Sequence, residues 1–67
     1  MRDSGKMAFY IQVTNRRDEF QRRVNEITEA RETHQMPNLH ETEMMHTLLD
    51  LSVYNTLIET LKDDLGV

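Results

Sequence analysis

The side chains of this sequence that could do chemistry include a carboxylate and an imidazole three residues apart, in Glu43-Met44-Met45-His46. A Glu-x-x-His motif on a helix holds di-iron or di-manganese centres in helical bundles when facing helices add further glutamates. The first half of the chain offers such glutamates only among arginines. They are Glu19, Glu26 and Glu29. We therefore favour the plainer interpretation, in which Glu43 and His46 lie on a helix surface and bind no metal.

The remaining candidates for catalysis or metal binding are equally sparse. His34, His40 and His46 recur every six residues, a spacing that does not align them on one helical face, so zinc bound by histidines is not expected. There is no Ser/His/Asp arrangement, glycine-rich phosphate loop or paired-carboxylate motif. A chain this short also has few residues with which to line an enclosed pocket. We expect no enzyme, no cofactor and no metal.

Length and composition favour an oligomer. The chain has 67 residues, enough for one small domain with a limited core, and its lack of cysteine excludes disulfides and thiolate zinc sites as stabilising devices. Oligomerisation remains, most simply as a homodimer. No apolar run approaches the length that spans a membrane. These features predict a cytoplasmic protein without a membrane partner.

Charge is distributed unevenly along the chain. The formal net charge is −4, which argues against a generic nucleic-acid binder. Residues 1–31 carry seven basic and five acidic side chains, whereas residues 32–67 carry one basic and seven acidic side chains. This asymmetry indicates two surfaces with different partners, or merely mixed solvated helix faces.

The elements that would position these residues begin with a candidate β-strand at residues 7–14, after a polar arm at residues 1–6 that we expect to be disordered. Phe9, Ile11 and Val13 alternate with Ala8, Tyr10, Gln12 and Thr14, and β-branched and aromatic residues are frequent. Thr14 or Asn15 would cap a first helix extending to about Thr33. A lone strand cannot satisfy its own backbone polar groups, so it would have to pair with another chain.

The two predicted helices carry different apolar patterns. Phe20, Val24 and Ile27 form one narrow stripe on the first helix. Pro37 marks the connection, and the second helix begins near Glu41 with Gly66 at its C-cap. Residues 44–51 are apolar over a wide arc, which indicates burial on more than one side and therefore a partner chain. Weak helix propensity at residues 53–56 predicts a bend or break there.

These residues together resemble the ribbon-helix-helix family of DNA-binding repressors. The resemblance rests on Phe9–Thr14 as a strand leading into a capped helix, on the stripe of Phe20, Val24 and Ile27, and on Thr42–Leu49 as the opening of the second helix. It covers residues 7–57, and residues 58–67 would be an acidic C-terminal helical extension. The implied fold class is mostly α, with one N-terminal strand and two helices in an intertwined homodimer.

The resemblance also implies a function, that of a transcription regulator whose two-stranded ribbon enters the major groove of double-stranded DNA. Ala8, Tyr10 and Gln12 would contact bases. Lys6, Arg16, Arg17 and Thr42 would contact phosphates. The dimer core would consist of Phe9, Ile11, Val13, Phe20, Val24, Ile27, Met45, Leu48 and Leu49.

An all-α hairpin is the alternative. In it residues 7–33 form one long helix, with Met7, Tyr10, Ile11 and Thr14 on one face and an interruption of the stripe at Arg17. Two such hairpins would dimerise into a four-helix bundle. The protein would then be a protein–protein interaction module, such as an inhibitor, an adaptor or an antitoxin-like regulator, which binds a protein partner through its acidic C-terminal helix.

Overall fold

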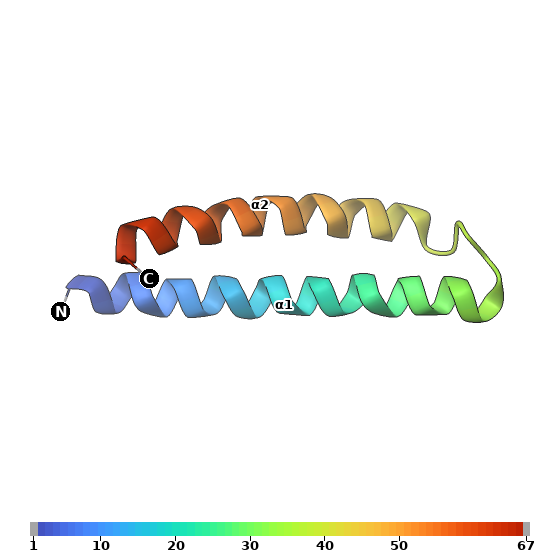
Figure 1. Cartoon of the computed structure of the whole chain (residues 1–67), viewed down its shortest axis with the longest axis horizontal. Coiled ribbons are helices and arrows are strands. Elements are labelled where there is room, and N and C mark those ends of the chain that lie inside the picture. The colour runs from blue at the N-terminus through green and yellow to red at the C-terminus, as the bar shows by residue number, and fades with distance from the viewer. Residues whose placement is uncertain (1, 67) are drawn as a thin grey trace.

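The structure, a computed structural model, describes residues 2–66 and the side chains of residues 4–66. It consists of two α-helices, α1 (Arg2–His34) and α2 (Glu41–Leu65), which lie antiparallel with both chain ends at the same end of the molecule (Figure 1). The hairpin measures 51 × 15 × 15 Å. Neither helix in the described part of the chain is long and apolar enough to cross a membrane.

Residues 7–14 are helical, so the predicted strand is wrong, and with it the ribbon-helix-helix resemblance; the all-α hairpin is the correct alternative. The reason is that α2 extends far enough to cover this segment: Val13 is buried with Ile58 and Leu61, and Tyr10 packs against them. In a helix the segment satisfies its backbone within its own chain, whereas a strand needs a second chain. The predicted cap at Thr14 or Asn15 is also absent, because α1 is continuous through both residues, and the Thr14 hydroxyl donates to the Ile11 carbonyl at 2.8 Å.

A heptad pattern on each helix forms the core. The side chains that α1 turns toward α2 recur at spacings of three and four, and those of α2 do the same, which is the spacing of a two-helix coiled coil. On α1 they are Tyr10, Val13, Arg17, Phe20, Val24, Ile27 and Arg31. On α2 they are Met44, Thr47, Leu51, Tyr54, Ile58, Leu61 and Leu65. Ile27 is the most deeply buried side chain of the described residues, at 1% exposure.

Arg17 interrupts the apolar pattern of α1 but remains within the interface. Its guanidinium donates to the side-chain oxygen of Asn55 on α2 at 3.2 Å and to Asp18 at 2.8 Å. Phe20, one turn further on, meets Tyr54 with ring centroids 5.4 Å apart. The position tolerates a charge because the long side chain reaches the edge of the interface, where it is one-third exposed.

The connection between the helices is compact. Gln35 takes the left-handed conformation (φ 53°), and the Met36 N–H donates to the Arg31 carbonyl at 2.9 Å, which closes α1 with a Schellman motif. His40 is also left-handed (φ 54°), and α2 starts at Glu41 as predicted. Arg31 donates to the Leu39 carbonyl at 2.9 Å and so ties the loop to α1.

The helix ends agree with the sequence prediction at the connection and at Gly66, but not at the start of α1. Gly66 is the left-handed C-cap of α2, as predicted, and donates to the Lys62 carbonyl. The break predicted at residues 53–56 is absent, since α2 is continuous there. Residues 2–6, expected as a disordered arm, form the first turns of α1, and residues 58–65 complete α2 and supply Ile58 and Leu61 to the core. Met1, the first residue of the predicted arm, lies outside the described residues.

Candidate functional site

The outer side of α2, which faces away from α1, is unusually apolar. Four large hydrophobic side chains of this helix remain substantially exposed: Met45 (58%), Leu48 (49%), Leu49 (64%) and Val53 (66%). Between Glu43 and Glu59 the sequence contains a single charged residue, Asp50. Since charged side chains normally occupy the outer face of a solvated helix, this surface has the composition of an interface.

Small side chains follow the large ones along the same face. A shallow hollow on α2 is lined by Ser52, Val53, Thr56, Leu57 and Thr60. The hydroxyls of Thr56 and Thr60 donate to the backbone carbonyls of Ser52 and Thr56, at 3.0 and 3.1 Å. Those hydroxyls are thereby satisfied within the helix, so an apolar partner could cover the hollow without stranding them.

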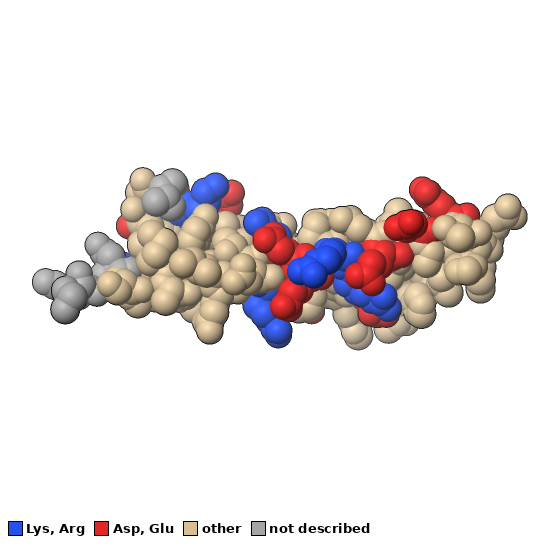
Figure 2. Space-filling view, turned by 90° about the horizontal axis from the view of Figure 1, so that it is seen from below, with Lys and Arg blue, Asp and Glu red and all other residues tan. Residues whose placement is uncertain are grey.

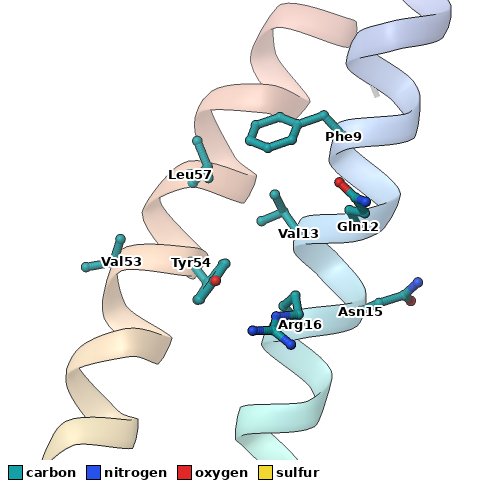
Figure 3. Close-up of a pocket in the computed structure, with 8 residues that line it drawn as sticks. All are labelled: Phe9, Gln12, Val13, Asn15, Arg16, Val53, Tyr54 and Leu57. Carbon is teal, nitrogen blue, oxygen red and sulfur yellow. The ribbon is translucent and has the colours of Figure 1, made fainter.

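A wider groove opens beside the hollow, between the two helices (Figure 3). Its volume is about 660 Å³. Its lining residues are Phe9, Gln12, Val13, Asn15 and Arg16 from α1 and Val53, Tyr54 and Leu57 from α2. Figure 3 shows the Phe9 ring reaching toward α2 on the side of Leu57. Val53 and Leu57 line both the groove and the hollow, so the two are joined through these apolar side chains.

The opposite side of the molecule is charged. Figure 2, which views the hairpin from the α1 side, shows basic and acidic side chains interleaved over the middle of the molecule. Short-range pairs account for much of this pattern, such as Arg16 with Glu19 at 3.5 Å and Arg23 with Glu26 at 3.4 Å. The surface of α1 beyond residue 15 is therefore a mixed, solvated face, in contrast to the outer face of α2.

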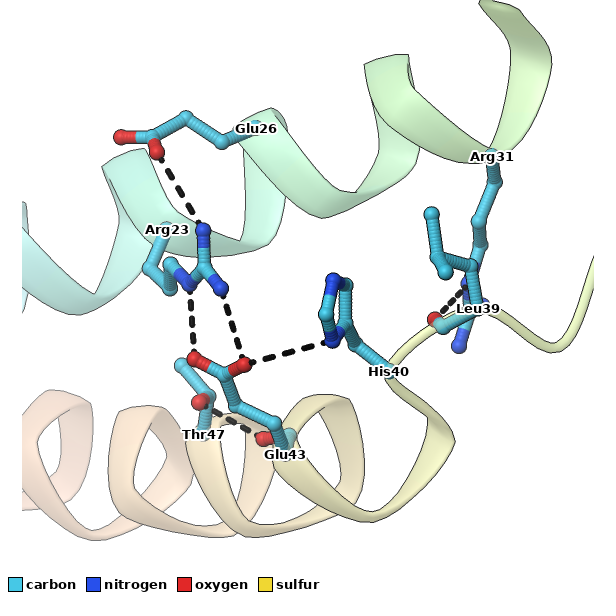
Figure 4. Close-up of polar contacts among 7 residues, drawn as sticks. All are labelled: Arg23, Glu26, Arg31, Leu39, His40, Glu43 and Thr47. Atoms are coloured by element: carbon cyan, nitrogen blue, oxygen red, sulfur yellow. Dashed lines mark hydrogen bonds and ion pairs between the residues drawn. The ribbon is translucent and has the colours of Figure 1, made fainter. Parts of the chain in front are cut away.

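One ion pair joins the two helices near the loop (Figure 4). Arg23 on α1 donates two hydrogen bonds to the Glu43 carboxylate on α2, at 2.7 and 2.9 Å. The hydrogen bonds from Arg23 lower the pKa of Glu43 below its ordinary value, and those to Glu43 raise the pKa of Arg23. The bidentate contact joins the two helices at this register, because a planar guanidinium and a carboxylate can form two parallel hydrogen bonds.

The residues predicted to contact DNA bases do not share a face. Successive helical residues are rotated by about 100°, so positions 8 and 12 lie one turn apart on a similar side of α1, whereas position 10 points to nearly the opposite side. Ala8 is exposed, Tyr10 packs against the core, and Gln12 lines the groove. The described residues form no ribbon to carry them into a DNA groove.

The residues predicted to contact phosphates are dispersed as well. Lys6 pairs with Asp64 at 3.5 Å, Arg16 with Glu19, and Arg17 with Asp18 and Asn55. Thr42 is exposed in the first turn of α2. Each of the three basic side chains thus has an acidic partner in the hairpin, and they do not form a basic patch.

The residues predicted to form the dimer core separate into two groups. Val13 and Ile27 are buried, and Phe20 and Val24 half-buried, between α1 and α2 of one chain. The others are exposed in the single chain. They are Phe9 and Ile11 on α1, and Met45, Leu48 and Leu49 on α2. The last three are the apolar residues that the sequence predicted to need a partner.

Sequence reasoning missed Val53, Thr56 and Thr60 as parts of this surface. The signal that could have found them is the second series of spacings on α2, in which Met45, Leu49, Ser52 and Thr56 recur at four, three and four residues. No group of three potential metal ligands comes together within the described residues. Glu43 of the Glu-x-x-His motif is instead engaged by Arg23.

Comparison of the chain with models of protein families, with curated proteins and with solved structures finds no match.

Proposed function

We propose that this protein is a protein–protein interaction module, and that the outer face of α2 is its binding surface. The observation that carries the proposal is the exposure of Met45, Leu48, Leu49 and Val53 on a helix with one charge between residues 43 and 59. A partner that covers these side chains removes their apolar surface from water, which favours association by about 25 cal/mol per Å².

The contrast between the two helices supports the choice of α2. On α1, exposed positions between residues 16 and 32 are occupied mainly by charged side chains, many of them paired with one another. On α2 the exposed positions between residues 43 and 59 carry one charged side chain, Asp50, and are otherwise mainly apolar or hydroxylic. Covering the α2 face therefore removes fewer charges from water than covering α1 would.

The proposal can be tested by site-specific photo-crosslinking in cells that express the protein. A photoreactive phenylalanine analogue replaces Leu49 in the centre of the α2 face, and in a control chain it replaces Glu29, which is exposed on α1. We expect irradiation to convert the Leu49 variant into a covalent protein adduct of discrete mass and to leave the Glu29 variant largely unmodified.

Equal labelling at the two positions, or no adduct at Leu49, would contradict the proposal. Both substitutions lie on solvent-exposed positions, so neither should disturb the hairpin core. Far-ultraviolet circular dichroism of each purified variant confirms that the helices are intact before the adducts are compared.

A further inference from the structure

On the outer face of α2, the side chains at the centre of the face are large in the half nearer the loop and small in the other half. Met45 and Leu49 project from the half nearer the loop, where they are 58% and 64% exposed. Ser52, next to the midpoint, and Thr56 and Thr60, in the other half, line the hollow. All five lie within a sector of the helix that points away from the buried positions, given a rotation of about 100° per residue.

This arrangement is self-complementary under a two-fold axis. If two copies of α2 pack antiparallel with the axis between Ser52 and Val53, residue 49 of one copy lies opposite residue 56 of the other. Residue 45 likewise lies opposite residue 60. The large side chains of each copy then enter the hollow of the other copy, so every contact occurs twice, as in an isologous interface.

The parallel alternative packs poorly. It would place Leu49 against Leu49 and Met45 against Met45, and would leave the small side chains of the two hollows facing each other across a void. Acidic residues approach one another at the helix ends in either orientation, for example Glu41 and Asp63 in the antiparallel one. Packing rather than charge therefore decides the orientation.

The exposed surface area of the hairpin is consistent with the burial of one helix face against a second hairpin. The chain exposes 5196 Å², whereas a globular monomer of 8.0 kDa exposes roughly 4,450 Å². The excess of roughly 750 Å² is close to the ~800 Å² that each partner buries in a standard protein–protein interface. A second hairpin offers an apolar helix face of equal length.

We infer that the partner of the α2 face is a second copy of this chain, packed antiparallel so that Met45 and Leu49 of each copy fill the hollow of the other. This inference rests on the proposed function, because it names the occupant of the same surface. It also goes further, since it fixes which residues meet across the interface.

Engineered cysteines test the arrangement directly, because the natural chain contains none. Met45→Cys and Thr60→Cys are made as separate single variants. In the antiparallel dimer these two positions face each other, whereas the two copies of residue 45 are more than about 20 Å apart, at 1.5 Å of helix per residue. A disulfide needs Cα atoms within about 7 Å.

We expect mild oxidation of an equimolar mixture of the two variants to produce a covalent dimer on a non-reducing gel, and each variant alone to remain mostly monomeric. The substitution Leu49→Glu, added to both variants, should reduce cross-linking of the mixture at least tenfold. The matched substitution Ile11→Glu, at a 51% exposed position of α1, should leave it unchanged.

Cross-linking of Met45→Cys with itself would overturn the inference in favour of a parallel pair. An absence of cross-linking in the mixture would overturn it altogether. The proposed function would survive that second result if photo-crosslinking at Leu49 still captured a protein of different mass, so the failure of one proposal can be distinguished from the failure of the other.

Discussion

The same substitution, isoleucine to alanine, made at Ile27 and at Ile11 distinguishes the helical hairpin from a fold with an N-terminal strand. Ile27 is 1% exposed between the helices, whereas Ile11 is 51% exposed on α1. In the predicted ribbon, Ile11 would have faced the core. We therefore expect Ile27→Ala to destabilise the protein strongly and Ile11→Ala to have little effect.

The magnitude follows from the burial. Removing three buried carbons costs about 2.4 kcal/mol in transfer free energy, at ~0.8 kcal/mol per methylene. The cavity left behind brings the loss for Ile27→Ala into the range of about 2–5 kcal/mol. A chain of this length has a total stability of roughly 3–10 kcal/mol. At Ile11 the smaller loss of contact is offset by the better helix propensity of alanine, so we expect a change within about 0.5 kcal/mol.

Urea unfolding followed by circular dichroism at 222 nm measures both variants. We expect the midpoint to fall sharply for Ile27→Ala, or the variant to be partly unfolded without urea, and to stay near that of the natural chain for Ile11→Ala. Losses of similar size at the two positions would refute the orientation of α1 described above.

Three further predictions follow from particular contacts. Gln35→Gly should raise the free energy of unfolding by about 0.5–1 kcal/mol, because glycine adopts the left-handed conformation at φ 53° without strain; thermal unfolding would measure the increase, and a decrease would contradict it. Arg17→Leu should raise the urea midpoint by extending the apolar interface, and an unchanged or lower midpoint would mean that the bond to Asn55 contributes at least as much as the added apolar contact. The pKa of Glu43 is lowered in the folded state by Arg23, so the contribution of this pair is complete above about pH 4.3 and is lost as the pH falls through the lower folded-state pKa. Glu43→Gln should therefore remove part of the acid sensitivity of the urea midpoint, and an identical pH profile for the two proteins would exclude that role.

Much of the hairpin could be predicted from local sequence signals. Pro37 and the weak helix formers before it placed the connection, and Gly66 placed the end of α2. The stripe of Phe20, Val24 and Ile27 correctly indicated the side of α1 that faces its partner. These signals are reliable because each residue restricts the backbone conformation of its immediate neighbours in the sequence.

The segment at residues 7–14 was wrongly predicted because its side chains fit either period. Tyr10 and Val13 lie three residues apart and fit a helix, whereas Phe9, Ile11 and Val13 alternate and fit a strand. The deciding fact is tertiary: Ile58 and Leu61 of α2 lie opposite Val13 and bury it within the same chain. Local propensity does not contain that information.

The candidate surface was predicted in part. The sequence indicated that residues 44–51 are too apolar for a single chain, and Met45, Leu48 and Leu49 are indeed exposed in the hairpin. The hollow formed by Thr56 and Thr60 was missed because hydroxyl side chains carry no hydrophobic signal. Only the arrangement of large and small side chains along one face makes them relevant.

The mass of the purified protein in solution shows whether two hairpins associate through the outer face of α2. We expect sedimentation equilibrium at micromolar concentration to give about 16 kDa, twice the 8.0 kDa mass of the chain, and Leu49→Glu to give a helical species at the monomer mass. A natural chain that sediments as a monomer at every concentration, or a Leu49→Glu variant that dimerises as well as the natural chain, would contradict a dimer formed through the outer face of α2.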